Sequence, residues 1–386
     1  MRCAFPAPAA EQRIAAAQAV RVAPPQGLET TLPTIFRART VNTPHGAFGY
    51  IRIFSFNVSD ADEFVSEFVR LTAALPQNGL IIDVRGNGGG LIYASEQLLQ
   101  VLTPRRIEPE RAQFVNSPLI LDICRRHAPS PLSPALNLSP WVESIAQAVE
   151  TGATYSRGFP ITPEEACNAV GQRYHGPVVL ITDALCYSAT DIFAAGFQDH
   201  EIGPILGTSG NTGAGGANVW THHLLQLLTE DPVAGADRSP FQPLPHNAGM
   251  RVAIRGMLRV GSRAGLPLED LGVMPDRRHW MTKNDLLNGN EDLINEAAAI
   301  LGGLPVHTLA VSTGAVDAHT LHVDVTTANV GRLDVYLDER PQQSLDVADG
   351  TTRLTLPLPQ GGADELELRG YEGSRLVAAR RVSLHS

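Results

Sequence analysis

The sequence is short of lysine and of long apolar runs. Lys283 is the single lysine among 30 basic residues, and the net charge is −10. Because no basic stripe is present to neutralise phosphates, the sequence argues against nucleic-acid binding. No apolar run approaches the ~20 residues that a membrane-spanning helix needs, so we expect no contact with a membrane.

Closely spaced pairs of cysteines are also absent. The four cysteines, Cys3, Cys124, Cys167 and Cys186, lack the C-x-x-C spacing of a structural zinc site, and nothing else in the sequence implies a metal or a cofactor. The amino terminus lacks the unbroken apolar stretch of a signal peptide, which favours a cytoplasmic location. A true start upstream of Met1 is the alternative.

The remaining composition is that of a globular protein of two or three domains, with 43% hydrophobic and 18% charged residues in 386. Residues 1–44, rich in Ala and Pro, predict a lead-in with one helix at 11–20. A strand at 48–54, a helix capped by Ser59 and a buried strand at 80–84 predict a right-handed parallel crossover. Further helices are expected at 92–102, 142–149, 189–198 and 293–301, and further strands of the parallel pattern at 177–182, 204–207 and 250–255.

The carboxyl-terminal part has a different sequence pattern. Segments that alternate with period two recur from 321 to 384, separated by Gly, Pro and Asp. That pattern predicts an antiparallel β-sandwich at 305–386. The preceding α/β region spans 45–302 and carries a polar, Pro-dotted insertion at 103–176.

Ser188 ends a small-residue turn between the expected strand at 177–182 and the expected helix at 189–198. Ligands of open α/β sheets bind at the carboxyl edge of the strands, where a serine at a helix start can act as a nucleophile. The ordinary alternative is that Ser188 caps the helix. Asp191 has two interpretations of the same kind: a first-turn carboxylate favoured by the helix dipole, or a residue that positions the site.

A glycine-rich turn, R-G-N-G-G-G at 85–90, follows the strand at 80–84. Glycines allow the backbone to approach a ligand, and two N–H groups aimed at one point stabilise an oxyanion. The alternatives are a phosphate cradle or a plain tight turn. The turn does not match G-x-G-x-x-G and lacks the P-loop lysine, so a nucleotide site is disfavoured.

Together, five segments resemble the tail-specific (carboxyl-terminal processing) serine peptidase family. They are 49–53, 82–90, 188–191, 207–216 and 269–276, in the order and spacing of that family. The resemblance covers about residues 45 to 300. It implies an α/β fold with a ClpP/crotonase-like core of parallel βαβ units, Ser188 as nucleophile, and the N–H groups of Gly89 and Ala189 as the oxyanion hole. It implies a polypeptide substrate and no cofactor. The PDZ module that is usual in the family is not found.

One departure from the family concerns the base. The better-known branch uses a Ser–Lys dyad, but Ala214 stands where its lysine is expected. The sequence of a later glycine-rich run, G-A-G-G at 213–216, resembles the tricorn-core and chlamydial-protease branch, which uses Ser, His and Glu. That resemblance assigns the glutamate to Glu269, whose alternative role is an ordinary surface acid.

The histidine is expected upstream of the first strand, where His45 is the one candidate; it is also a plausible turn residue. His200, His222 and His223 follow Ser188 in the sequence. The sequence thus predicts a serine endopeptidase with Ser188, His45 and Glu269 as catalytic residues. Two alternatives remain: a ligand- or peptide-binding relative without a functional base, and a crotonase-type enzyme that acts on a thioester.

Overall fold

The computed structural model describes residues 27–128, 137–216, 218–230, 239–317 and 320–384. The helix predicted at 11–20 lies outside these residues. Within them, no helix combines the length and the apolar character needed to cross a bilayer.

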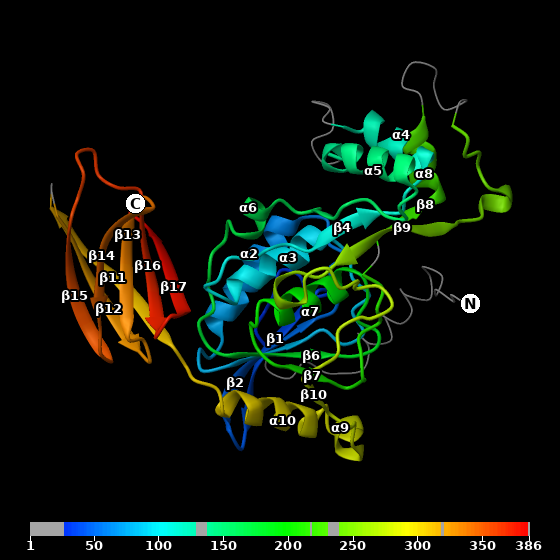
Figure 1. The fold of residues 1–386 in the computed structure, drawn as a ribbon. Coiled ribbons are helices and arrows are strands. Elements are labelled where there is room, and N and C mark those ends of the chain that lie inside the picture. The colour runs from blue at the N-terminus through cyan, green and yellow to red at the C-terminus, as the bar shows by residue number, and fades with distance from the viewer. Residues whose placement is uncertain (1–26, 129–136, 217, 231–238, 318–319, 385–386) are drawn as a thin grey trace.

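A six-stranded sheet forms the centre of the molecule (Figure 1). Its strands, in spatial order, are β1 (Phe36–Thr43), β2 (Gly46–Ile53), β3 (Leu80–Asp83), β6 (Val178–Thr182), β7 (Ile205–Gly207) and β10 (Arg277–Arg278). β1 is antiparallel to β2, and every other pair in the sheet is parallel. All residues of β3 and β6 are buried, as their unbroken apolar runs predict.

Helices cover both faces of this sheet. α2 (Ala61–Ala74), α3 (Ile92–Val101) and α7 (Ala189–Asp199) lie on one face, and α10 (Glu291–Gly302) lies on the other (Figure 1). α10 buries Leu293 and Ala297 against β3 and β6, which form a second apolar cluster with it. A short helix, α9 (Lys283–Leu287), precedes α10 at the same end of the molecule.

Two details at the start of the chain differ from the sequence prediction. The region predicted as a lead-in contains β1, which pairs with β2 along its whole length. The cap of α2 is Asp60 instead of Ser59, because the Asp60 carboxylate accepts hydrogen bonds from the N–H groups of Asp62 and Glu63 at 2.9 and 3.0 Å.

A second, antiparallel sheet extends away from the centre. Its order is β5 (Phe159–Pro160), β4 (Arg111–Phe114), β9 (Arg251–Leu258) and β8 (Asn218–Thr221), and the helices beside it are α4 (Pro118–Arg126), α5 (Ser139–Thr151) and α8 (His222–Thr229) (Figure 1). α6 (Glu164–Cys167) contacts α3. The strand predicted at 250–255 is therefore β9, which pairs with β4 and β8 and not with the parallel sheet. Two separate stretches of chain build this subdomain, of which the predicted insertion supplies one.

The carboxyl-terminal region consists of two antiparallel sheets with an apolar core of their own. One contains β11 (Thr308–Asp317), β12 (Thr320–Ala328) and β15 (Gly350–Pro357); the other contains β14 (Arg340–Asp346), β13 (Arg332–Leu337), β16 (Glu365–Glu372) and β17 (Arg375–Ser383). Burial alternates along β12 and β13, as the period-two pattern predicts.

Candidate active site

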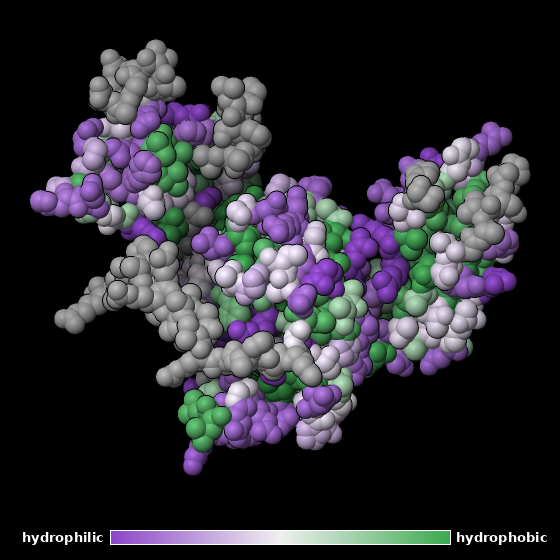
Figure 2. All heavy atoms as spheres, turned by 180° about the vertical axis from the view of Figure 1, so that it is seen from behind, coloured by the Kyte–Doolittle hydropathy of each residue, from purple (hydrophilic) through white to green (hydrophobic). Residues whose placement is uncertain are grey.

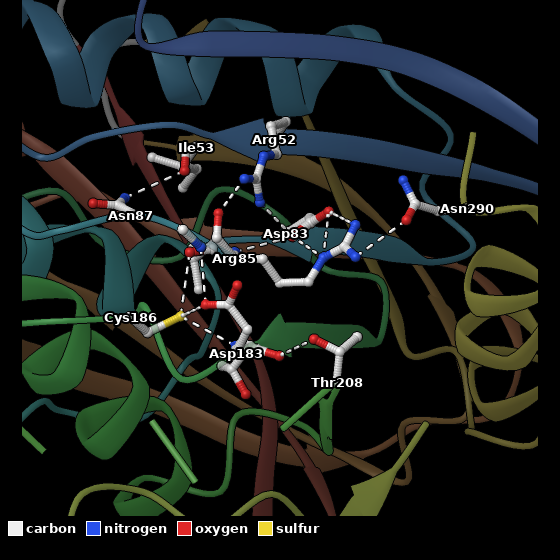
Figure 3. A network of polar contacts seen from close by, with 12 residues as sticks. Arg52, Ile53, Asp83, Arg85, Asn87, Asp183, Cys186, Thr208 and Asn290 are labelled. Atoms are coloured by element: carbon white, nitrogen blue, oxygen red, sulfur yellow. Dashed lines mark hydrogen bonds and ion pairs between the residues drawn. The ribbon is translucent and has the colours of Figure 1, made fainter. Parts of the chain in front are cut away.

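Two loops meet where the neighbouring strands β3 and β6 end. The glycine turn 85–90 follows β3, and the turn 183–188 follows β6. The Tyr187 N–H donates to the Asn87 carbonyl at 3.1 Å, and the Gly86 N–H donates to Asp183 Oδ1 at 2.9 Å. The Cys186 thiol donates to the Val84 carbonyl at 3.2 Å (Figure 3). These bonds hold the two loops together at the carboxyl edge of the sheet.

Ser188 precedes the first residue of α7 in a strained conformation. Its φ is 57° and its ψ is −122°, a region that non-glycine residues seldom occupy. Its side chain makes no capping hydrogen bond to α7. The capping interpretation is therefore wrong, and the half-buried hydroxyl is free of hydrogen bonds to the residues that the structure describes.

Gly89 lies against Ser188. Its φ is +97°, and a Cβ at this position would lie 2.6 Å from the Tyr187 carbonyl oxygen and 2.8 Å from Ser188 Cβ. A Cβ on the neighbouring Gly88 would meet no atom within 4 Å. The close approach of the two loops therefore needs glycine at 89 and not at 88.

The two N–H groups predicted to form an oxyanion hole differ in the structure. No described group accepts a hydrogen bond from the Ala189 N–H, which opens α7. The Gly89 N–H donates to Asn87 Oδ1 at 2.9 Å. Asn87 is buried, and its amide in turn donates to the Ile53 carbonyl at 3.2 Å. One donor is thus free, and the other is shared with a side chain that sequence reasoning did not identify.

A third loop, 213–216, closes over Tyr187. The Gly213 N–H donates to the Cys186 carbonyl at 2.8 Å. A Cβ at Gly213 or at Gly215 would lie 2.0 Å from a carbon of the Tyr187 ring. The ring occupies the space that two side chains would need, so this glycine run is required to seat the residue before Ser188.

Asp191 joins this loop to the start of α7. Its carboxylate accepts hydrogen bonds from the N–H groups of Ala214 at 3.2 Å and Gly215 at 3.0 Å. It also accepts one from the backbone of Ser188. Burial raises the pKa of Asp191 to about 6, although these hydrogen bonds favour the charged form. Of its two possible roles, the contacts favour positioning.

Glu269 lies behind the same loop. Both of its carboxylate oxygens are 2.9 Å from the Met257 nitrogen, and the next residue, Asp270, donates its N–H to the Ala214 carbonyl at 3.3 Å. Burial raises the pKa of Glu269, and the nearby charge of Asp191 acts in the same direction. The structure brings Glu269 to the region of Asp191, but none of the described histidines is hydrogen bonded to it.

His45 does not reach this region. It occupies the exposed turn between β1 and β2, at the amino ends of the parallel strands. Ser188 follows the carboxyl end of β6, which runs parallel to β3 and, through it, to β2. β2 has eight residues, which at about 3.3 Å each separates the two edges by roughly 25 Å. The prediction that His45 is the base disagrees with this topology.

Among the other histidines, His200, His222 and His279 are hydrogen bonded elsewhere. His200 Nε2 accepts from the Glu108 N–H at 2.9 Å, and His222 Nε2 is 2.7 Å from the Gln242 carbonyl. His223 is exposed on α8. His279 is buried, with Nε2 at 2.7 Å from Asp285 and Nδ1 at 2.5 Å from Glu296. None of the hydrogen bonds between described residues joins a histidine ring to Ser188.

An ion-pair network at the carboxyl end of β3 supports the glycine turn (Figure 3). Asp83 is buried, and its carboxylate pairs with Arg52 at 2.5 Å and with Arg85 at 2.8 Å. Burial alone would raise the pKa of Asp83, but the two guanidinium groups hold it well below its ordinary value. Arg52 also donates to the Arg85 carbonyl, and Arg85 donates to Asn290 Oδ1 at 3.1 Å. Sequence reasoning missed this network, since its members come from three separate elements.

Comparison with known proteins gives one family match. Residues 47–229 match the model of peptidase family S41. No curated protein matches the chain.

Among solved structures, mature CPAF complexed with lactacystin is 17% identical with a TM-score of 0.47, covering 69% of this chain and 55% of that one. The photosystem II D1 C-terminal processing protease is 17% identical, with a TM-score of 0.36 and coverage of 67% and 47%. The tricorn protease is 20% identical, with a TM-score of 0.31 and coverage of 66% and 17%. The chain thus spans about half the length of the CPAF chain, 55% of it.

Proposed function

We propose that the chain, whose residues 47–229 match the model of peptidase family S41, hydrolyses peptide bonds with Ser188 as the nucleophile. The observation that carries the proposal is the conformation of Ser188. A strained residue at a helix start, with its hydroxyl free of hydrogen bonds to described residues, lies against the glycine turn of the neighbouring strand. Strain of this kind persists where the surrounding structure holds it, and active sites are a common place for it.

In this mechanism Ser188 Oγ attacks the carbonyl carbon of the scissile bond. The negative charge that develops on the carbonyl oxygen is stabilised by the free Ala189 N–H and by the amino end of α7. The Gly89 N–H is the second donor, shared with Asn87 Oδ1. A donor of this kind contributes about 3 kcal/mol to stabilising the transition state. The base takes the proton of Ser188 and gives it to the leaving amine as the scissile C–N bond breaks, and water then hydrolyses the acyl-enzyme.

The carboxylates behind the site have separate roles in the proposal. Asp191 is a positioning residue, because it holds the loop 213–216 and the backbone of Ser188 in one arrangement. Glu269 is the carboxylate that orients and charge-balances the base, as the family resemblance assigns it. A serine hydroxyl needs such a base near neutral pH.

The domain organisation is part of the same proposal. The parallel sheet with helices on both faces is a ClpP/crotonase-like core, which extends to 302 and includes β1 at its amino-terminal side. The two antiparallel sheets at 305–386 form a separate β-sandwich. The substrate is a polypeptide, bound in an extended conformation at a sheet edge.

A second candidate function is a non-catalytic binding protein with the same fold. Two observations favour it: no hydrogen bond between described residues joins a histidine ring to Ser188, and Ala214 occupies the position where a lysine is expected. Such a protein would keep the loops and lack an activated serine.

Fluorophosphonate labelling of the full chain, read by intact mass, separates the two. The peptidase predicts a single adduct that disappears in Ser188→Ala and persists in Ser59→Ala, a control at an exposed serine. Absence of labelling in a folded sample would refute the peptidase and support the binding protein.

A further inference from the structure

The antiparallel subdomain contains a buried arginine that has no counter-charge among the residues that the structure describes. Arg255, on β9, is 8% exposed and is paired across the sheet with Phe114 of β4. β9 lies between β4 and β8 (Figure 1). The site is separate from Ser188, and the inference does not rest on the proposed function.

Two aromatic rings flank the guanidinium. Its carbon lies 5.2 Å from the centre of the Phe114 ring and 5.7 Å from that of Trp220. The two rings contact each other edge to face at 5.9 Å. Aromatic faces attract a cation, so they explain how the group is held. They do not supply the negative charge that a buried cation ordinarily requires.

No such charge is present among the residues that the structure describes. They give Arg255 neither an ion pair nor a hydrogen bond, and its Nε atom is buried without a partner. The described ionisable group that acts electrostatically on Arg255 is the Cys124 thiol, which is neutral because burial raises its pKa to about 12. Burial also lowers the pKa of Arg255 to about 10, which measures the cost of the missing anion.

Arg259 provides an internal comparison. It lies four residues further along the chain and is equally buried, but Asp199 meets it with both oxygens, at 2.6 Å and 3.0 Å. Among the described residues, one buried guanidinium is thus neutralised by a carboxylate and the other is not. Of the Arg255 nitrogens, only Nε is both buried and unpartnered, so the terminal nitrogens are within reach of solvent.

We propose that Arg255 anchors a carboxylate-binding site between β4, β8 and β9. A carboxylate carries the one charge needed, and its two oxygens match the fork of a guanidinium. A carboxylate matches the single charge of Arg255, whereas a phosphate dianion would exceed it.

The test uses the full chain and sodium acetate as the probe, with sodium chloride and sodium phosphate at matched ionic strength. Thermal unfolding and saturation-transfer NMR of the acetate methyl group measure binding. The variants are Arg255→Met, which removes the charge at similar length, and Arg255→Lys, which keeps the charge and loses the fork. Arg157→Met, an exposed arginine of the same subdomain, is the matched control.

Acetate should raise the melting temperature of the parent chain and of Arg157→Met, and the acetate Kd should rise at least about tenfold in Arg255→Met. Without acetate, Arg255→Met should melt no lower than the parent, because it removes an uncompensated buried charge. An equal response of Arg255→Met, an equal effect of chloride, or binding of phosphate in preference to acetate would overturn the proposal. If Arg255→Met does not fold, Arg255→Lys decides, since unchanged acetate affinity in that variant would also contradict the fork.

Discussion

The contact between Gly89 and Ser188 gives the sharpest test of the active-site geometry, because the adjacent glycine is a built-in control. Gly89→Ala places a Cβ 2.6 Å from the Tyr187 carbonyl oxygen and 2.8 Å from the Ala189 nitrogen. Both are backbone atoms, which cannot rotate aside. Gly88→Ala places the same group in open space. An added methyl group should therefore separate the two loops at position 89 and leave them unchanged at position 88.

The loss of stability expected for Gly89→Ala follows from the backbone conformation at this position. An alanine at φ +97° costs about 1–3 kcal/mol in strain, and relieving the overlap brings the expected loss to about 2–4 kcal/mol. For a domain of this size that lowers the melting temperature by roughly 5–15 °C. The larger effect is on reactivity: separating the loops displaces Ser188 and the Ala189 N–H, and a shift of ~1 Å can slow such a reaction about 100-fold.

The assay is the rate of fluorophosphonate labelling at 15 °C, well below the melting temperature, with near-UV circular dichroism to establish that each variant is folded. Gly89→Ala should label about 100-fold more slowly than the parent chain, and Gly88→Ala should label within about twofold of it. Labelling of Gly89→Ala at the parental rate would refute the argument. Equal slowing in Gly88→Ala would show that the whole turn responds without regard to the contact.

Two further predictions concern stability and the base. Glu96 is 1% exposed and burial raises its pKa to about 7, so the folded state favours the protonated form. Its stabilising effect is complete below pH ~4.5 and is lost as the pH rises through 7, which amounts to about 3 kcal/mol. Urea unfolding at pH 5 and pH 8 should show a loss about 3 kcal/mol smaller in Glu96→Gln than in the parent. Glu110, whose pKa burial also raises, contributes a loss in both proteins, and an equal loss in the two would contradict the prediction. His45→Ala should leave the labelling rate of Ser188 unchanged, because the two residues lie at opposite edges of the sheet; a drop of more than about tenfold would show that the edge argument is wrong.

Much of the fold was accessible from local pattern. The buried runs that became β3 and β6 are apolar up to their last residues, Asp83 and Thr182, and α7 and α10 lie within two residues of the predicted helices. β1 was missed because arginine and threonine interrupt its apolar positions, and its burial depends on pairing with β2. β14 was missed because almost every residue in it is exposed, so no alternation marks it.

The candidate site was likewise predictable only in part. That the loops after β3 and β6 would meet follows from strand order, and Gly89 does contact Ser188. The hydrogen bonds of Asn87 and Asp191 could not be predicted, because their partners lie on loops that only the tertiary fold brings together. The position of His45 could have been predicted: a residue that precedes a parallel strand lies at the amino edge.

A base for Ser188 must lie, like Ser188 itself, at the carboxyl edge of the parallel sheet. In a parallel sheet, groups reach the nucleophile from segments that follow a strand, and His279 is the described histidine that directly follows one, β10. Its ring is held by Asp285 and Glu296, whose hydrogen bonds raise its pKa against the effect of burial. Both ring nitrogens are therefore already hydrogen bonded to carboxylates, and neither is left to accept a proton from a hydroxyl. His279 fastens α9 and α10 to the sheet, and it can serve as a base only after one of the two carboxylates has released its ring nitrogen.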